Sequence, residues 1–453
     1  MYGHSASGFR RSKKVPAAVL ALTVLLLLSY TAADACLALQ IPDSVIANVR
    51  ARVDEGWMPG MIIAVVDSSA TRFFSYGVTA RDGAPVNEHT IFEIGSVTKV
   101  FTSLALAEMA MRGAVRLDDP VESLLPNGVR MPRFGAHQVT LQHLALHLSA
   151  IPDQPTNLGN SDADNPWAAY DSTALFEFLN GFALPHAPGE RFRYSNLGSG
   201  LLGYVLARRE RTDYENLIQR RVTAPLGLAD TRIELSPAQQ QRVAQGHAED
   251  GSVAAAWTFD ALAGAGGLRS TGVDLARLLQ AALGHIDSPL DTALQLMLGW
   301  NERRLGHRRI LYHGGRTGGF RAFVGLDFER RRGVVVLANS SEGVDDIGFH
   351  LLDPQQPLNP VHRVLSMSPE MLDSYVGEYE LKSGAQLRVG REHRQLIAHI
   401  VGLGSGRIYP SAPDQFFARA SNAQFSFARD ASGRAATVVV ILHGQLITGR
   451  RIH

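Results

Sequence analysis

The chain has 453 residues, of which 45% are hydrophobic, enough to bury a substantial core and to form two or three compact units. Its 44 basic and 43 acidic residues leave a formal net charge of +1, which excludes a global field that would attract nucleic acid or an anionic membrane surface. The single cysteine excludes an intramolecular disulfide and a zinc site built from cysteines.

The N-terminus has the order of a secretory signal. Basic residues at 10–14 precede an uncharged apolar run at 15–28, and small residues follow up to Ala35. We therefore expect a signal peptide at residues 1–35 and an exported, periplasmic or secreted protein. The apolar run is shorter than the roughly 20 residues that span a bilayer, which disfavours an uncleaved anchor. Lipid attachment at Cys36 is disfavoured because the residues before it fit a lipoprotein cleavage site poorly.

Strand and helix signals from residue 61 to residue 352 predict a mixed domain. Apolar runs at 61–66 and 72–78 around a turn predict a β-hairpin that opens a sheet. Helical patterns dominate from Pro120 to Asp260, for example at 199–208 and 213–221. Two strand-like runs and a closing helix then follow, at 320–328, 333–339 and 344–352. We expect an α/β fold in which a sheet is flanked by helices and carries a helical lobe.

A linker at residues 353–365 separates this domain from a β-rich tail at 366–453. The Pro and Gln content of Pro354–Pro360 continues neither helix nor strand. Short strand-like runs with turns between them occupy 375–381, 386–389, 395–401, 415–419, 424–427 and 436–442. The tail is predicted to be a small all-β barrel or sandwich.

Ser96 and Lys99 form a Ser-x-x-Lys arrangement at the start of a predicted helix. A spacing of three residues puts the hydroxyl and the amine on one helix face, where they can share a proton. The chain contains only four lysines, and arginine supplies the rest of its 44 basic residues. Lys99 is therefore informative, because a buried lysine can lose its proton whereas arginine cannot.

Two further segments carry candidate chemistry. Tyr194 lies two residues before Asn196, ahead of a helix rich in small residues, and its hydroxyl can act as a base or an acid if an ammonium lies nearby. Residues 313–319 read His-Gly-Gly-Arg-Thr-Gly-Gly just before a predicted strand. The missing side chains would let a substrate lie along the strand edge, where backbone N–H groups can reach an oxyanion.

Together the three motifs resemble the class C β-lactamase and penicillin-binding D,D-peptidase family. They are Ser96-x-x-Lys99, Tyr194-x-Asn196 and His313-Gly314-Gly315, in that order. Segments at 92–95, 117–120, 140–144 and 264–268 agree with the family as well. The likeness runs from about Gln40 to Leu352, and it implies an antiparallel sheet flanked by helices, with the active site at the junction with a helical lobe.

The resemblance also implies roles for individual residues. Ser96 corresponds to the nucleophile, Lys99 and Tyr194 to the pair that transfers protons, and the backbone N–H groups of Ser96 and Arg316 to the oxyanion donors. Asn196 corresponds to a residue that holds the substrate amide and orients Lys99.

Of three further positions, one agrees with the family pattern and two depart from it. Gln154 has the position of an amide-binding glutamine. His313 stands where most relatives carry a lysine that helps to receive the substrate carboxylate, and Ala150 stands where they carry glycine. With an ordinary pKa near 6.5, His313 is expected to bind carboxylate better on mild acidification.

The function expected from these residues is hydrolysis through an acyl-enzyme, on β-lactams or on D-alanyl peptides of the cell wall. An esterase using the same residues and a penicillin-binding sensor with little turnover remain alternatives. The implied partner is a small-molecule or peptide substrate, with no nucleic acid, no metal and no cofactor, and the oligomeric state stays open. His143 and His147 have the spacing of zinc ligands but lack the glutamate of a His-Glu-x-x-His motif, so we expect core or capping roles.

Overall fold

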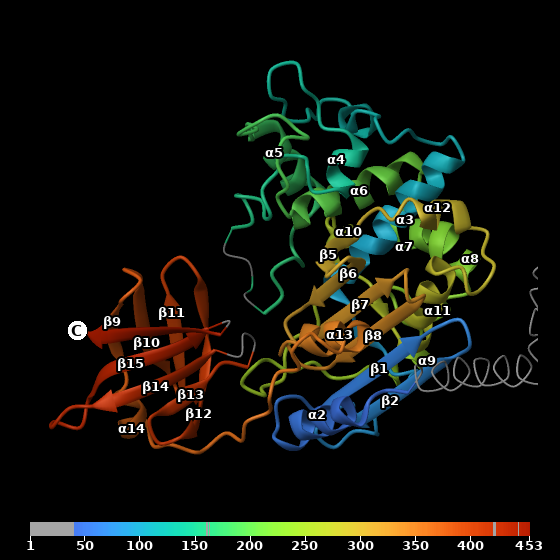
Figure 1. The fold of residues 1–453 in the computed structure, drawn as a ribbon. Coiled ribbons are helices and arrows are strands. Elements are labelled where there is room, and N and C mark those ends of the chain that lie inside the picture. The colour runs from blue at the N-terminus through green and yellow to red at the C-terminus, as the bar shows by residue number, and fades with distance from the viewer. Residues whose placement is uncertain (1–39, 160–161, 163, 420–422, 443) are drawn as a thin grey trace, which may run out of the picture. The chain divides into compact units, whose positions relative to one another are not determined.

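The computed structural model in Figure 1 describes residues 40–159, 162, 164–419, 423–442 and 444–453. The signal peptide expected at 1–35 and the question of a lipid on Cys36 lie outside the described residues. Within the described part of the chain, no helix combines the length and apolar character needed to cross a membrane.

A six-stranded antiparallel sheet forms the centre of the first domain, with strand order β2-β1-β8-β7-β6-β5 (Figure 1). Its strands are β1 (Gly60–Val66), β2 (Thr71–Gly77), β5 (Asn301–Leu305), β6 (Arg308–Arg316), β7 (Arg321–Asp327) and β8 (Arg332–Ala338). β1 pairs with β2 and with β8, so that Ile63 lies opposite both Phe74 and Val336. The opening hairpin, the two later strands and the antiparallel sheet flanked by helices are confirmed.

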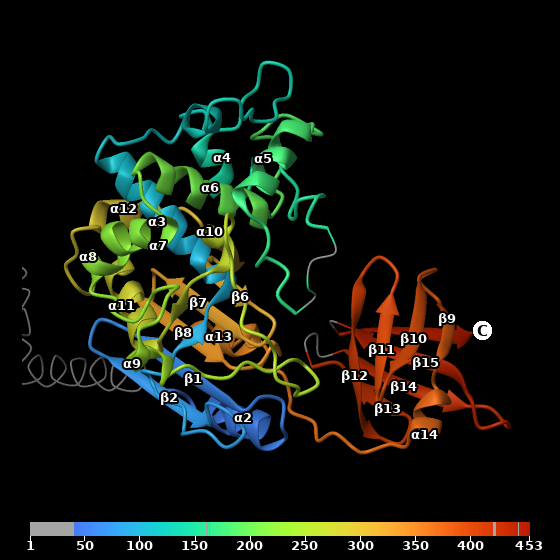
Figure 2. The same cartoon turned by 180° about the vertical axis from the view of Figure 1, so that it is seen from behind.

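Helices cover both faces of this sheet, which explains why every residue of β1 is buried. Alternate side chains of a strand point to opposite faces, so Ile62 joins one apolar core and Ile63 the other. The first core includes apolar residues of α11 (Gly272–Ala282), and the second includes those of α2 (Asp43–Asp54) and α13 (Asp345–Leu352). Figure 2 shows the same elements from behind.

Helices are the main secondary structure in the region where the sequence predicted a helical lobe. Between β2 and β5 the chain also forms α3 (Thr98–Met111), η2 (Val121–Leu124), α4 (Leu141–Ala145), α5 (Ser172–Gly181), α6 (Asn196–Arg209), α7 (Tyr214–Ile218), η3 (Gln219–Thr223), α8 (Ala224–Leu226), α9 (Pro237–Gln240), α10 (Ala263–Gly266) and α12 (Asp291–Gln295). The helices expected at 199–208 and 213–221 fall within α6 and within α7 continued by η3. Two short strands, β3 (Phe92–Glu93) and β4 (Arg269–Ser270), pair with each other beside Ser96.

The β-rich tail is confirmed as a closed eight-stranded barrel preceded by α14 (Pro369–Asp373). Its strands are β9 (Gly377–Leu381), β10 (Gln386–Glu392), β11 (Gln395–Ile400), β12 (Gly404–Ala412), β13 (Gln415–Phe417), β14 (Gln424–Arg429), β15 (Ala435–Leu442) and β16 (Gln445–Arg451). Sequence signals missed β12 and β16. β12 contains two glycines and Pro410, which predict a turn, and only pairing with its barrel neighbours makes it a strand.

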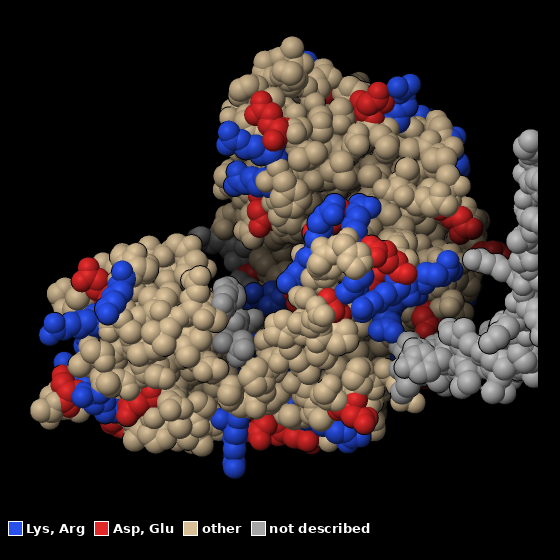
Figure 3. Space-filling view, viewed as in Figure 1, with Lys and Arg blue, Asp and Glu red and all other residues tan. Residues whose placement is uncertain are grey.

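Charged side chains of both signs are interspersed on the face seen in Figure 3, in keeping with the balanced composition. A buried ion pair joins the barrel to the sheet domain. Arg419 Nη1 donates to Glu342 Oε1 at 2.9 Å, with side-chain exposures of 7% and 3%. Beside it, Trp57 stacks on Phe417 at 5.8 Å between ring centroids.

A chain cut within Pro354–Pro360 is expected to give a soluble fragment that keeps its activity, because every candidate site residue lies upstream of the cut. The fragment should melt at a lower temperature than the full chain, since it loses the partners of Glu342 and Trp57. For a domain of this size the shift is about 2–4 °C for each kcal/mol lost. Thermal melts and kcat/KM of both proteins test this, and aggregation or inactivity of the fragment would contradict it.

Candidate active site

Ser96 lies in a single turn of 3-10 helix, Gly95–Val97, that leads directly into α3. The preceding Gly95 has φ of +47°, and a Cβ there would lie 2.7 Å from the backbone nitrogen of Arg316. A Cβ on Gly315 would lie 2.0 Å from the carbonyl oxygen of Ile94. Both positions therefore require glycine, because the Ser96 turn and β6 approach each other more closely than any side chain allows.

Lys99 occupies the first turn of α3, and its side chain is buried, with 1% of the residue exposed. Its Nζ lies within hydrogen-bond distance of three oxygens, namely Ser96 Oγ at 2.8 Å, Asn196 Oδ1 at 2.7 Å and the carbonyl of Ala265 at 2.7 Å. The predicted sharing of a proton between Ser96 and Lys99 is therefore geometrically possible. Ala265 lies in the segment 264–268, which sequence analysis gave only as agreeing with the family, so its carbonyl was missed as a partner.

Burial controls the protonation of the two candidate proton carriers. Burial lowers the pKa of the Lys99 amine to about 7, although the Asp153 carboxylate raises it in part. Burial also raises the pKa of the Tyr194 hydroxyl, despite a side-chain hydrogen bond with Ser96 that lowers it. At neutral pH the amine can thus accept a proton, whereas the phenol remains protonated.

Tyr194 is held just before helix α6 by the segment around His147. The two rings lie 4.5 Å apart, and His147 Nδ1 accepts a hydrogen bond from the backbone N–H of Ser195 at 3.1 Å. Lys99 Nζ lies 5.0 Å from the centroid of the Tyr194 ring. His143 instead accepts from the backbone N–H of Thr140 and caps α4, so the core and capping roles expected for the two histidines are confirmed.

Asn196 begins α6 and contacts both Lys99 and a residue that sequence analysis missed. Asp153 Oδ1 accepts from the backbone N–H of Asn196 at 3.0 Å and from its Nδ2 at 2.9 Å. Gln154, the next residue and the predicted amide-binding position, is exposed. Ala150, earlier in the same loop, has φ of +63°, the left-handed region that explains why a glycine is usual at this position.

The segment 313–319 precedes strand β7 as expected, but His313, Gly314, Gly315 and Arg316 themselves lie in β6, a strand that the sequence did not predict. On one side β6 pairs with β7, but β5 ends opposite Tyr312. Among the described residues, the stretch 313–316 therefore has no strand partner on its second side. This open edge lies beside Ser96, which is the arrangement that the glycine pattern predicted for substrate binding.

The expected titration of His313 near neutral pH is wrong. The residue is buried, with 2% exposed, and burial together with the nearby Lys99 lowers the pKa of its imidazole to about 3. His313 therefore stays neutral and cannot receive a carboxylate as a cation at pH 5.5–7.5. The nearest cation on the same strand is the Arg316 guanidinium, whose side chain is 58% exposed and lies 3.5 Å from a Glu249 oxygen.

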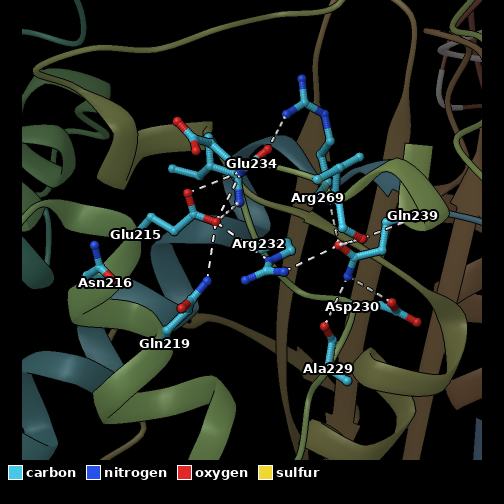
Figure 4. Close-up of polar contacts among 12 residues, drawn as sticks. Glu215, Asn216, Gln219, Ala229, Asp230, Arg232, Glu234, Gln239 and Arg269 are labelled. Carbon is cyan, nitrogen blue, oxygen red and sulfur yellow. Dashed lines mark hydrogen bonds and ion pairs between the residues drawn. The ribbon is translucent and has the colours of Figure 1, made fainter.

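A polar network links the strand that precedes Ser96 to a loop of the chain, and Figure 4 shows its part around Arg269, Glu215 and Gln239. Glu93 of β3, three residues before Ser96, accepts from the backbone N–H of Trp257 at 3.1 Å and lies 3.7 Å from Arg269. Arg269 in turn donates to the carbonyl of Ile233 at 2.7 Å, in a loop that Glu215 and Gln239 tie down. The support of Ser96 thus extends well into the lobe.

A family model described as Beta-lactamase matches residues 45–351. The chain is 35% identical over 230 residues to the D-alanyl-D-alanine-carboxypeptidase/endopeptidase AmpH of Escherichia coli strain K12. That match covers 49% of this chain and 57% of AmpH, so the chain spans little more than half the length of this relative.

Two solved structures show the same fold. A class C β-lactamase superposes with a TM-score of 0.62 at 22% identity, covering 69% of this chain and 97% of the other. The octameric penicillin-binding protein homologue from Pyrococcus abyssi also has a TM-score of 0.62 at 22% identity, but covers 90% of this chain and 99% of its own. With more than half of its length matched by the family model, the chain belongs to the Beta-lactamase family.

Proposed function

We propose that the protein is a serine hydrolase that acts through an acyl-enzyme on Ser96. The observation that carries this proposal is the trio of oxygens around Lys99 Nζ. The carbonyl oxygens of Asn196 and Ala265 can only accept hydrogen bonds, whereas the Ser96 hydroxyl can also donate. A neutral amine, which has two N–H groups and one lone pair, therefore satisfies both carbonyl oxygens and keeps its lone pair for the Ser96 proton.

Acylation in this mechanism begins when neutral Lys99 takes the Ser96 proton and Oγ attacks the substrate carbonyl. The backbone N–H groups of Ser96 and Arg316 donate to the oxyanion of the tetrahedral intermediate. Tyr194, protonated at neutral pH, donates its proton to the leaving group as the carbonyl–leaving-group bond breaks. The resulting phenolate is stabilised by the Lys99 ammonium.

Deacylation reverses these proton movements. The Tyr194 phenolate takes a proton from water, the hydroxide attacks the ester carbonyl, and the bond to Ser96 Oγ breaks. The Lys99 ammonium returns its proton to Oγ, which restores neutral Lys99 and protonated Tyr194 for the next cycle. No further acid, base or cofactor is required for the protons to balance.

The proposed substrates are β-lactams or D-alanyl peptides of the cell wall. The names of the relatives support this choice, since AmpH is a D-alanyl-D-alanine-carboxypeptidase/endopeptidase and a structural neighbour is a class C β-lactamase. An exported enzyme would meet both kinds of substrate, which agrees with the signal-like residues 1–35. Because His313 is neutral, Arg316 is the proposed cation for a substrate carboxylate. A neutral His313 equally suits the alternative function, an esterase for uncharged acyl esters.

Mass spectrometry of the intact protein tests the acyl-enzyme directly. After exposure to a β-lactam, the protein is expected to gain the mass of the opened lactam and to lose it again within one assay, whereas Ser96→Ala should gain nothing. An adduct that persists for hours would indicate the penicillin-binding sensor. An adduct on Ser96→Ala, or turnover by that variant, would refute the nucleophile.

The pH profile tests the role of Lys99. Its pKa is lowered by burial to about 7, so the neutral amine is present above that pH and is lost as the pH falls. We expect kcat/KM to fall about tenfold per pH unit on the acid side of pH 7 and to level off above it. Because His313 stays neutral, the ratio of rates for charged and uncharged substrates should not change between pH 5.5 and 7.5.

Arg316→Met tests how the substrate carboxylate is bound, because methionine keeps the length of the stem and the backbone N–H but removes the charge. We expect KM for a carboxylate-bearing β-lactam to rise roughly tenfold, the scale of one charge-assisted hydrogen bond. Turnover of an uncharged nitrophenyl ester should change little. Equal effects on the two substrates would mean that the carboxylate is bound elsewhere.

A further inference from the structure

The Asp153 carboxylate accepts two hydrogen bonds at the start of helix α6. Both go to one oxygen, Oδ1, from the backbone N–H and the Nδ2 of Asn196. The backbone carbonyl of Asp153 also accepts from Leu197 N–H at 3.0 Å. No motif includes Asp153, because the loop that carries it is 43 residues from Asn196 in the sequence.

These contacts determine which end of the Asn196 amide faces Lys99. An amide has a donor end and an acceptor end, and an ionised carboxylate can only accept. Nδ2 must therefore face Asp153, which directs Oδ1 toward Lys99 Nζ at 2.7 Å. If the amide turned over, two oxygens would face each other at Asp153 and two nitrogens would face each other at Lys99.

The orientation of the Asn196 amide also determines how Lys99 hydrogen-bonds to Ser96, the proposed nucleophile. With Oδ1 of Asn196 and the carbonyl of Ala265 both accepting from Nζ, the two N–H groups of the neutral amine are used. Only Ser96 Oγ, at 2.8 Å, then lies opposite the lone pair. A reversed amide would donate to that lone pair and compete with the Ser96 hydroxyl.

We propose that Asp153 is a positioning residue that, through the Asn196 amide, aims the lone pair of Lys99 at Ser96. This inference rests on the proposed function. Asp153 does not touch the nucleophile, and its effect passes through the amide orientation and through its charge.

The charge of Asp153 gives a second, separable effect. The groups around Lys99 are the Tyr194 hydroxyl, which stays protonated, the imidazoles of His147 and His313, and Asp153. Burial lowers the pKa of His147 to about 4 and that of His313 to about 3, so both rings are neutral at pH 7. Asp153 is the carboxylate that favours the ammonium form of Lys99 and thereby raises its pKa.

The test compares Asp153→Ala with Asp153→Asn in the full chain. Alanine removes the acceptor, so acylation should slow about 10- to 100-fold, the scale on which a misaligned catalytic group loses rate, with little change in KM. Asparagine keeps an acceptor oxygen for Asn196 but no charge. Its activity at the optimum should be largely retained, while the acid limb of kcat/KM moves to lower pH because Lys99 loses its proton more readily.

A double variant separates this mechanism from general damage to the fold. If Asp153 acts through Asn196, then Asp153→Ala should cost nothing further in an Asn196→Ala background. Asp171→Ala is the matched control, because Asp171 caps α5 in the same lobe by accepting from Ala174 N–H. It should lower the melting temperature slightly and leave the acylation rate and the acid limb unchanged.

Three results would overturn the proposal. They are a normal rate in Asp153→Ala, losses that multiply in the double variant, and an unmoved acid limb in Asp153→Asn. If Asp153→Ala does not fold, the pH profile of Asp153→Asn decides. Ser96→Ala is measured in parallel to separate failure of the proposed function from failure of this inference. Activity in Ser96→Ala refutes the proposed function itself. An inactive Ser96→Ala together with a normal rate in Asp153→Ala refutes only the role of Asp153.

Discussion

A single buried amine is the constraint on which the site depends. Removing the Lys99 amine from water disfavours its charge, and three oxygens supplied by three separate segments satisfy its hydrogen-bonding capacity. Ser96 comes from the turn before α3, Asn196 from the start of α6 and Ala265 from α10. Since no one of these segments is adjacent to another in sequence, the amine also joins the helical lobe to the nucleophile.

The same site requires a very close backbone approach. Gly95 and Gly315 let the Ser96 turn lie against β6 where any Cβ would collide with backbone atoms. β5 stops short of this stretch, so a strand edge stays open beside the hydroxyl. The glycines thus allow the position of Ser96, and the end of β5 leaves the neighbouring stretch of β6 without a second strand partner among the described residues.

Burial explains why histidine in place of the family's lysine at position 313 removes a positive charge from the site and does not merely weaken it. The imidazole at position 313 is enclosed, and burial lowers its pKa so that it stays neutral. The proposed function assigns the substrate carboxylate to Arg316, whose exposed guanidinium lies at the open end of β6. We therefore propose that an exposed cation selects the substrate, while a buried amine transfers the protons.

The sequence by itself determined the parts that depend on local pattern. Apolar runs bounded by turn residues predicted the hairpin β1–β2 and the strands β7 and β8, and the spacing of Ser96 and Lys99 on a helix start predicted their contact. Ordered motifs indicated the family, and the tail was predicted to be all-β.

The remaining features became visible only in the folded molecule, because they depend on contacts between residues distant in the chain. Barrel closure makes Gly404–Ala412 a strand, burial keeps His313 neutral, and the fold brings Asp153 to Asn196 and Ala265 to Lys99. Burial and the direction of a hydrogen bond are properties of the packed molecule, and no periodicity or spacing in the chain encodes them.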